Sequence, residues 1–130
     1  MKYMIQINVP ADQCDAIMAS YSKDDMEAMF AHMNALNNDL HSAGEWVDGQ
    51  GLAGPSLVKT VRAASNGQPQ VTDGPAREGH ILVGYWVVDV KNEDRALEIA
   101  ARASACPGPD GKPGNDPIEV HPIPEGPTPA

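Results

Sequence analysis

The sequence has few basic residues, few cysteines and no long apolar run, and each shortage bears on what the protein can be. Only nine of its 130 residues are Lys or Arg against 18 Asp or Glu, a formal net charge of -9. Nucleic acids and acidic membrane surfaces require a basic face, so both are disfavoured as partners. No run approaches the ~18 apolar residues of a membrane-spanning helix. Met1-Lys2 leads directly into a strand pattern without a signal-peptide core, and we expect a cytoplasmic protein.

Familiar cofactor motifs are also missing. The chain contains no Gly-x-Gly-x-x-Gly, P-loop or Gly-x-Ser-x-Gly pattern, so we expect no cofactor. Cys14 and Cys106 lie in different segments without Cys-x-x-Cys spacing. In a reducing compartment we expect them to be inert thiols and not a disulfide.

The residues that are present predict a single core built from strands and helices. Hydrophobic residues make up 42% of the chain, enough for one domain. Apolar residues alternate from Tyr3 to Val9, which indicates a strand. From Met26 the period becomes that of an amphipathic helix, with a capping-box start at Ser22 and a stop at Gly44. The apolar stripe of this helix comprises Met26, Met29, Phe30, Met33, Leu36 and Leu40.

The middle of the chain predicts a short strand, a loop and a hairpin. Trp46 to Asp48 has strand character, and Gly49 to Pro55 is a loop punctuated by glycine. Asn66-Gly67 is a strong hairpin signal, so Leu57 to Ala64 should pair with Gln70 to Thr72.

The second half predicts a buried strand, a helix and a last strand. His80 to Val90 is almost continuously apolar, which is typical of a strand covered on both faces. Asn92 to Ala105 indicates a helix, and Pro107 to Pro117 a loop without regular pairing. Ile118 to Ile123 is the last strand, and residues 124–130 form a tail that we expect to be disordered. The sheet-facing side of the helix is predicted to hold Ala96, Leu97, Ala100, Ala101 and Ala103.

The order of these elements predicts a ferredoxin-like α+β domain over residues 1–123, with a hairpin inserted between its two halves. A domain this small has no third layer to cover the second apolar face of His80 to Val90. We therefore expect a homodimer joined through that face of the sheet.

Three short motifs carry a resemblance to a known family. Val71-Thr72-Asp73-Gly74-Pro75 is followed by Gly84-Tyr85-Trp86, then by the helix, and then by Ile118-Glu119-Val120-His121-Pro122-Ile123. This order resembles the YCII-related (DGPF-motif) family of small bacterial proteins, from Lys2 to about Ile123. The resemblance implies a dimeric α/β barrel and leaves the reaction unspecified. The chain departs from the family pattern at Ala76, where a phenylalanine is usual, and at His121, where an arginine is usual.

Asp73 is the first candidate for chemistry, with His80 as its partner. A carboxylate at the end of a strand can act as a general base or anchor a ligand, and a nearby histidine would complete an acid–base pair. Asp before Gly-Pro is equally an ordinary turn former, so both roles stay open. A metal site would require His80 and His121 to converge with Asp73 or Glu119, and no histidine spacing in the sequence indicates one.

Five further residues are candidates for contact with a ligand. Tyrosine and tryptophan offer a flat apolar face with one polar tip, which suits a small-molecule pocket and suits a core equally well. Charged and imidazole side chains near strand ends would supply polar contacts. The candidates are Tyr85, Trp86, Glu78, Arg62 and His121.

Two functions fit these observations. The first is a small dimeric enzyme that acts on an organic metabolite by acid–base chemistry without a cofactor. The second is a non-catalytic dimeric module that binds a ligand or a regulator. A fold alone does not decide between them, because function depends on the site.

Overall fold

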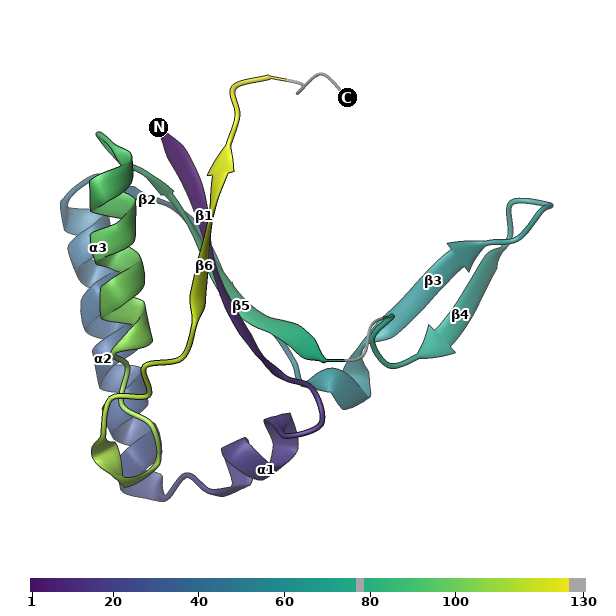
Figure 1. Cartoon of the computed structure of the whole chain (residues 1–130), viewed down its shortest axis with the longest axis horizontal. Coiled ribbons are helices and arrows are strands. Elements are labelled where there is room, and N and C mark those ends of the chain that lie inside the picture. Colours follow the sequence, from purple (N-terminus) through teal and green to yellow (C-terminus); the bar gives the residue numbers. More distant parts are fainter. Residues whose placement is uncertain (77–78, 127–130) are drawn as a thin grey trace.

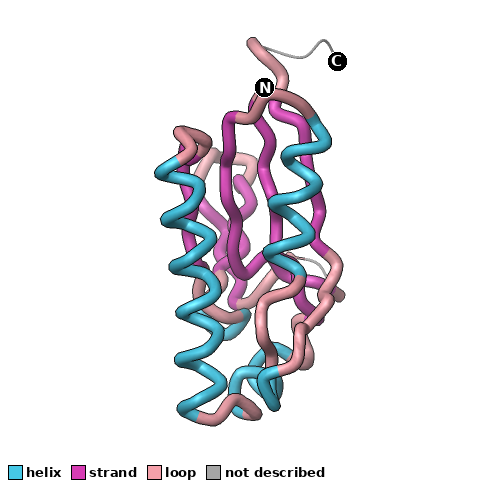
Figure 2. Tube along the Cα trace, turned by 90° about the vertical axis from the view of Figure 1, so that its left-hand side faces the viewer, coloured by secondary structure: helices cyan, strands magenta, loops and turns pink. Residues whose placement is uncertain are grey.

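The computed structural model describes residues 1–76 and 79–126 and shows a four-stranded antiparallel sheet with two long helices on one face (Figures 1 and 2). The predicted ferredoxin-like α+β class is confirmed. The sheet has the order β2-β5-β1-β6, with β1 Lys2–Pro10, β2 Trp46–Gly51, β5 His80–Asp89 and β6 Ile118–Ile123. The helices are α2 Lys23–Ser42 and α3 Glu93–Ser104.

The core lies between the sheet and the two helices. β1 runs down the middle of the sheet and pairs with β5 on one side and β6 on the other. Alternate side chains of β1 and β5 point toward the helices and are buried, as the period of two predicts. The buried core comprises Tyr3, Ile5, Leu36, Leu40, Trp86, Val88, Val90, Ala96, Ile99, Ala100 and Ala103.

Helix α2 begins at the predicted capping box. The Ser22 hydroxyl accepts a hydrogen bond from the Asp25 amide, and the Asp25 carboxylate accepts one from the Ser22 amide, each at 3.0 Å. Gly44 has a φ of 70° two residues after the helix ends, a left-handed conformation that glycine adopts without strain. Leu36 and Leu40 are buried over the sheet. The prediction that Phe30 belongs to the packed stripe is wrong, because its side chain is 54% exposed.

Helix α3 begins at the predicted N-cap, where the Asn92 side chain accepts a hydrogen bond from the Arg95 amide. Its buried face consists of Ala96, Ile99, Ala100 and Ala103, which follow the i, i+3, i+4, i+7 period. The predicted face was therefore misplaced in part. Leu97 is exposed, and Ile99 takes the position against the sheet.

The predicted hairpin is confirmed and forms a separate two-stranded sheet of β3 Lys59–Ala63 and β4 Pro69–Asp73. We call residues 59–73 the arm. It stands away from the rest of the domain, on the side of the sheet opposite the helices (Figure 1). The chain enters it through a short turn at Pro55–Leu57.

Three segments differ from the prediction. β2 continues to Gly51 through part of the predicted loop, because its backbone pairs with β5. A short helix α1, Cys14–Ala19, follows β1 and was not predicted. The segment Pro107 to Pro117 is not irregular: Pro107 and Pro113 form a β-bridge, and the amides of neighbouring glycines supply the donors that proline lacks.

Within the described residues, no layer of this chain covers the face of the sheet opposite the helices (Figure 1). The missing third layer is thus confirmed, and this uncovered surface is where candidate functional residues gather. No helix in the described part of the chain has the length and apolar character needed to cross a membrane. Of the predicted tail, Pro124 to Gly126 are described, and the remaining residues lie outside the description.

Candidate functional site

The uncovered face of the sheet holds polar side chains around an apolar centre. The register across the four strands places Gln50, Tyr85, Gln6 and Glu119 in one row. The adjacent row contains Asp48, Val87, Met4 and His121. Because Trp86 and Val88 point into the core, the neighbouring side chains of β5 point to this side. We call these eight residues the open face.

A tyrosine and an aspartate form the first polar pair of the open face. The Tyr85 hydroxyl donates a hydrogen bond of 3.0 Å to Asp48, which lies on the neighbouring strand. This hydrogen bond to a carboxylate, together with desolvation, raises the pKa of Tyr85 above its ordinary value. The phenol is therefore protonated at neutral pH and serves as a hydrogen-bond donor.

A glutamate and a histidine form the second pair, two strands away on β6. His121 Nε2 lies 3.0 Å from Glu119 Oε1, and the other oxygen of Glu119 accepts a hydrogen bond of 3.5 Å from Asn8. A carboxylate beside an imidazole is a common acid–base arrangement. With strands spaced ~4.8 Å apart, Tyr85 and Glu119 are separated by about 10 Å.

Met4 and Val87 lie between the two pairs and are half-buried. They form an apolar floor with hydrogen-bonding groups at either side. Such a surface accommodates a small molecule that has an apolar body and polar ends.

The structure brings together two of the predicted site residues, Tyr85 and His121, and separates them from His80. On β1, Met4 pairs with His121 and Pro10 pairs with His80, six residues further along the strand. At ~3.3 Å per residue this is about 20 Å. The two histidines therefore do not converge as a metal site would require. Among the described residues, no group of three His, Cys, Asp or Glu side chains is arranged to hold a metal ion.

Of the other predicted site residues, one lies in the core, two lie on the arm and one lies outside the described residues. Trp86 is buried in the core, where its indole nitrogen donates a hydrogen bond of 2.8 Å to Asn37 of α2. Asp73 and Arg62 lie on the arm. The Asp73 side chain is 82% exposed and forms an ion pair with Lys59 across the two strands. Glu78 lies outside the described residues.

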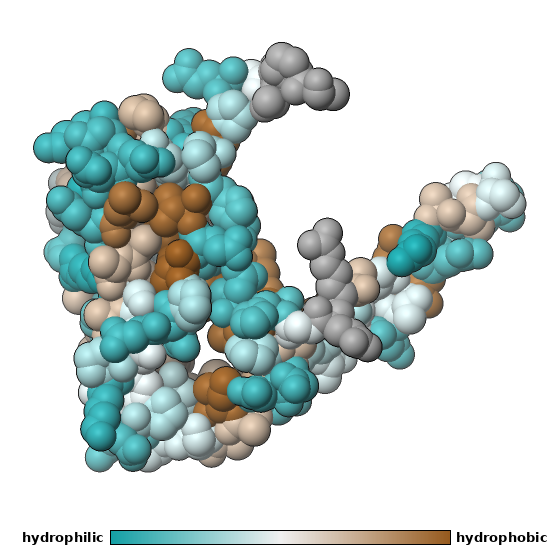
Figure 3. Space-filling view, viewed as in Figure 1, coloured by the Kyte–Doolittle hydropathy of each residue, from teal (hydrophilic) through white to brown (hydrophobic). Residues whose placement is uncertain are grey.

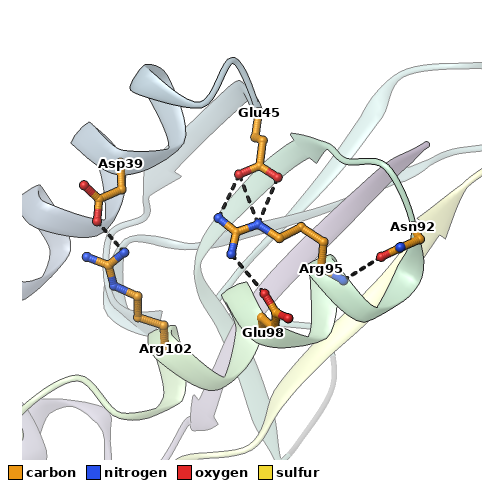
Figure 4. A network of polar contacts seen from close by, with 6 residues as sticks. All are labelled: Asp39, Glu45, Asn92, Arg95, Glu98 and Arg102. Carbon is orange, nitrogen blue, oxygen red and sulfur yellow. Dashed lines mark hydrogen bonds and ion pairs between the residues drawn. The ribbon is translucent and has the colours of Figure 1, made fainter.

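A second cluster of charges occurs where α3 meets α2 and β2, and its members neutralise one another (Figure 4). Arg95 binds the Glu45 carboxylate through Nε and Nη2 at 2.8–3.1 Å and also contacts Glu98. Arg102 pairs with Asp39 at 2.6 Å. Since each charge drawn in Figure 4 already has a partner, this cluster fastens α3 to the domain and offers a ligand no free charge.

A hollow of about 710 Å³ lies at another place, between the start of β1 and the end of β6. Its walls include Met1, Lys2, Asp89 and Pro122 to Gly126. The terminal ammonium group pairs with Asp89 at 2.9 Å and lowers the pKa of that carboxyl. This hollow contains neither of the hydrogen-bonded pairs of the open face, so the open face is the better candidate.

The cysteines do not contribute a reactive thiolate. Both are free, and Cys14 is buried. Burial raises the pKa of Cys106, and Asp116 adds to this effect, so the thiol is protonated at neutral pH.

Sequence reasoning missed Asp48 and did not pair Glu119 with His121. Asp48 was assigned only to a short strand, and the β-bulge between Trp46 and Asp48 determines which face it occupies. The Glu119-x-His121 spacing did carry a signal, because residues two apart in a strand share a face.

Comparisons with known proteins agree with the architecture. The family model of the YCII-related domain matches residues 1–107, which include β1 to β5 and both long helices. A comparison with curated proteins found no match. The family match covers most of the chain, and the Val-Thr-Asp-Gly-Pro motif lies within it at the end of the arm. The chain therefore belongs to the YCII-related domain family.

Proposed function

We propose that this protein is a homodimer that binds a small organic molecule on the open face and carries out acid–base chemistry on it without a cofactor. The observation that supports this most directly is the placement of two hydrogen-bonded pairs, Asp48–Tyr85 and Glu119–His121, on either side of one apolar floor. Neither pair is needed to satisfy a buried polar group, because the rows of the open face are half-buried or exposed.

The two pairs would have different roles. Tyr85, whose single O–H is donated to Asp48, would accept a hydrogen bond on its phenol oxygen from a hydroxyl group of the ligand. His121, oriented by Glu119, would accept or deliver a proton at the other end of the molecule. Two polar groups about 10 Å apart across the sheet suit a molecule that spans two strands.

The charge of the site restricts the ligand. Both pairs include a carboxylate, and the chain has a net charge of -9, so an anionic ligand is disfavoured. We infer that the ligand is a neutral compound with carbonyl or hydroxyl groups.

The homodimer follows from the uncovered sheet. Met4 and Val87 are apolar side chains on a face that no layer of this chain covers in the described residues. Contact between the open faces of two copies would bury these side chains and enclose the polar pairs, which would strengthen their hydrogen bonds by excluding water.

Ligand binding without catalysis is the second candidate. It is favoured by the exposure of His121 and Glu119, both of which are half or more exposed in a single chain. An acid–base pair in open water has little advantage over the solvent itself.

The first experiment is a thermal-shift screen of neutral aldehydes, ketones and alcohols against the dimer, followed by NMR detection of proton exchange or product formation for each hit. Tyr85→Phe removes the phenol oxygen and His121→Gln removes the acid–base group, and we expect each to weaken binding or turnover at least tenfold with little change in melting temperature. Lys91→Gln, at an exposed position outside the open face, is the matched control.

The same assay tests the sequence-based candidates. His80→Gln and Asp73→Asn should behave like the control if the open face is the site. If these two variants lose activity and the open-face variants do not, the site belongs at the arm and the proposal is wrong. Binding that depends on Tyr85 and His121 without any turnover would establish the binding module instead.

A further inference from the structure

The arm has an apolar surface that no described residue of its own chain covers. Its register pairs Val61 with Val71 and Ala63 with Pro69, and because alternate residues share a face, these four side chains lie on the same side. The Lys59–Asp73 ion pair lies on this side as well, at the base of the arm, so the face is apolar toward the tip. Val61 is 57% exposed and Val71 is 59% exposed. The opposite face carries Thr60, Arg62, Gln70 and Thr72. The arm is thus two-sided, like a strand pair of a larger sheet.

The arm is too small to be stable by itself. A two-stranded hairpin is marginally stable in water and usually needs a third strand or a packed surface. Among the described residues β3 and β4 pair only with each other, and the figures show the arm standing away from the helices and the main sheet (Figures 1 and 3). A contact outside this chain would supply the missing support.

The direction and the charge of the arm indicate a second copy of this chain. The arm extends on the side of the sheet that bears the open face (Figure 1), so a copy docked on that face would lie beside it. The arm contains Lys59, Arg62 and Asp73, a net charge of +1. The rest of the chain has seven basic and 17 acidic residues, a net charge of -10. The net charge of the arm corresponds to Arg62 on its polar face, because Lys59 pairs with Asp73, and this charge is attracted by the acidic body of a second copy.

We propose that the arm is a dimerisation element whose Val61–Val71 face packs against a second copy of this chain. This inference rests on the homodimer of the proposed function and adds an interface to it. By two-fold symmetry each copy gives one arm and receives one. The contact would also bring the tip of the arm, the turn at Asn66-Gly67, to the rim of the partner's open face.

Matched substitutions on the two faces of β4 test this contact. Val71→Asp places a charge on the apolar face, and Thr72→Asp places the same charge on the polar face one residue away. The dimer dissociation constant is measured by sedimentation equilibrium, with circular dichroism to check the fold. We expect Val71→Asp to weaken the dimer by about tenfold or more and Thr72→Asp to change it about twofold or less. Equal effects of the two variants would overturn the inference.

A more conservative variant distinguishes loss of the dimer contact from local unfolding of the arm. Val61→Thr combined with Val71→Thr keeps β-branched side chains, which suit a strand, and removes only apolar surface. It should weaken the dimer in the same direction. Hydrogen exchange of the parent protein gives an independent reading: the amides of residues 59–73 should be protected at concentrations where the dimer forms and exchange rapidly on dilution. Protection that does not depend on concentration would contradict the inference.

Val87→Asp separates this inference from the proposed function. If Val87→Asp dissociates the dimer and the Val71 variants do not, the open-face dimer stands and the arm contact is wrong. If the Val71 variants dissociate it and Val87→Asp does not, the arm contact stands and the open-face contact is wrong. A parent protein that sediments only at 13.8 kDa overturns both.

Discussion

The indole ring of Trp46 lies over Gly49, so closely that a methyl group at position 49 would come within 2.6 Å of the ring atom Cη2. The same ring stacks on His41 of α2, with centroids 4.4 Å apart. Gly49 therefore permits Trp46 to join β2 to the long helix.

Gly49→Ala should displace Trp46 and lower the free energy of unfolding by about 1–3 kcal/mol, as overpacking does. Gly51→Ala is the control, since a Cβ there meets nothing within 4 Å and lies in the same strand. Thermal unfolding and the NMR shifts of the His41 ring measure the effect. Equal stability of the two variants would show that the indole moves aside freely.

Asp48→Asn should lower the pKa of Tyr85 toward its ordinary value of 10.0. The carboxylate raises this pKa in the folded protein, so its hydrogen bond stabilises the fold below the ordinary pKa and is lost as the pH rises past the raised one. An NMR titration of the tyrosine rings measures the change. A Tyr85 pKa that is the same in the parent and in Asp48→Asn would mean that the hydrogen bond is absent in solution.

Arg95→Met should lower the free energy of unfolding by about 2 kcal/mol, because it leaves the Glu45 carboxylate, only 14% exposed, without its bidentate partner. Arg102→Met breaks the more exposed pair with Asp39 in Figure 4 and should cost less than about 1 kcal/mol. Denaturant unfolding of both variants gives the comparison. If Arg102→Met loses more free energy of unfolding than Arg95→Met, the Glu45–Arg95 pair is not the main attachment of α3 to the domain.

Asp25→Asn should make the melting temperature fall less steeply as the pH is lowered. Hydrogen bonding to the Ser22 amide lowers the pKa of Asp25 below 3.8. A lowered pKa adds stability that is present above the unfolded value and is lost as the pH falls through the folded value. Melting temperatures measured from neutral pH down to about pH 2 should therefore converge for the parent and the variant at the acid end. If the melting temperatures of the parent and Asp25→Asn differ by the same amount at every pH, the Asp25 carboxylate has no part in the loss of stability in acid.

Asp73→Asn should leave the melting temperature unchanged within error, because its pair with Lys59 is solvent-exposed and such pairs contribute little. The measurement is thermal unfolding beside Lys59→Gln. A clear loss of stability would show that the motif end of the arm is held by more than this ion pair.

The sequence by itself determined the class of elements and most of their limits. The Ser22–Asp25 capping box, the Asn92 cap and the Asn66-Gly67 turn act over a few residues, so their hydrogen bonds could be expected from local order alone. The alternation of apolar and polar residues in β1 and in β6 can likewise be read from the sequence, because it depends only on the two-residue period of a strand. The same local pattern showed that the His80 to Val90 strand has a second apolar side.

Only the tertiary structure decided which chemical groups meet. Asp48 reaches Tyr85 because a bulge in β2 and its pairing with β5 place both on one face, and neither is visible from sequence spacing. His80 and His121 look alike in sequence, and the register of β1 sends them to opposite ends of the sheet. Phe30 and Leu97 were both expected to pack and lie exposed, and Leu97 does so because the sheet contacts the face of α3 that bears Ile99. Long-range pairing sets these positions, because hydrogen bonds between strands join residues that are tens of positions apart.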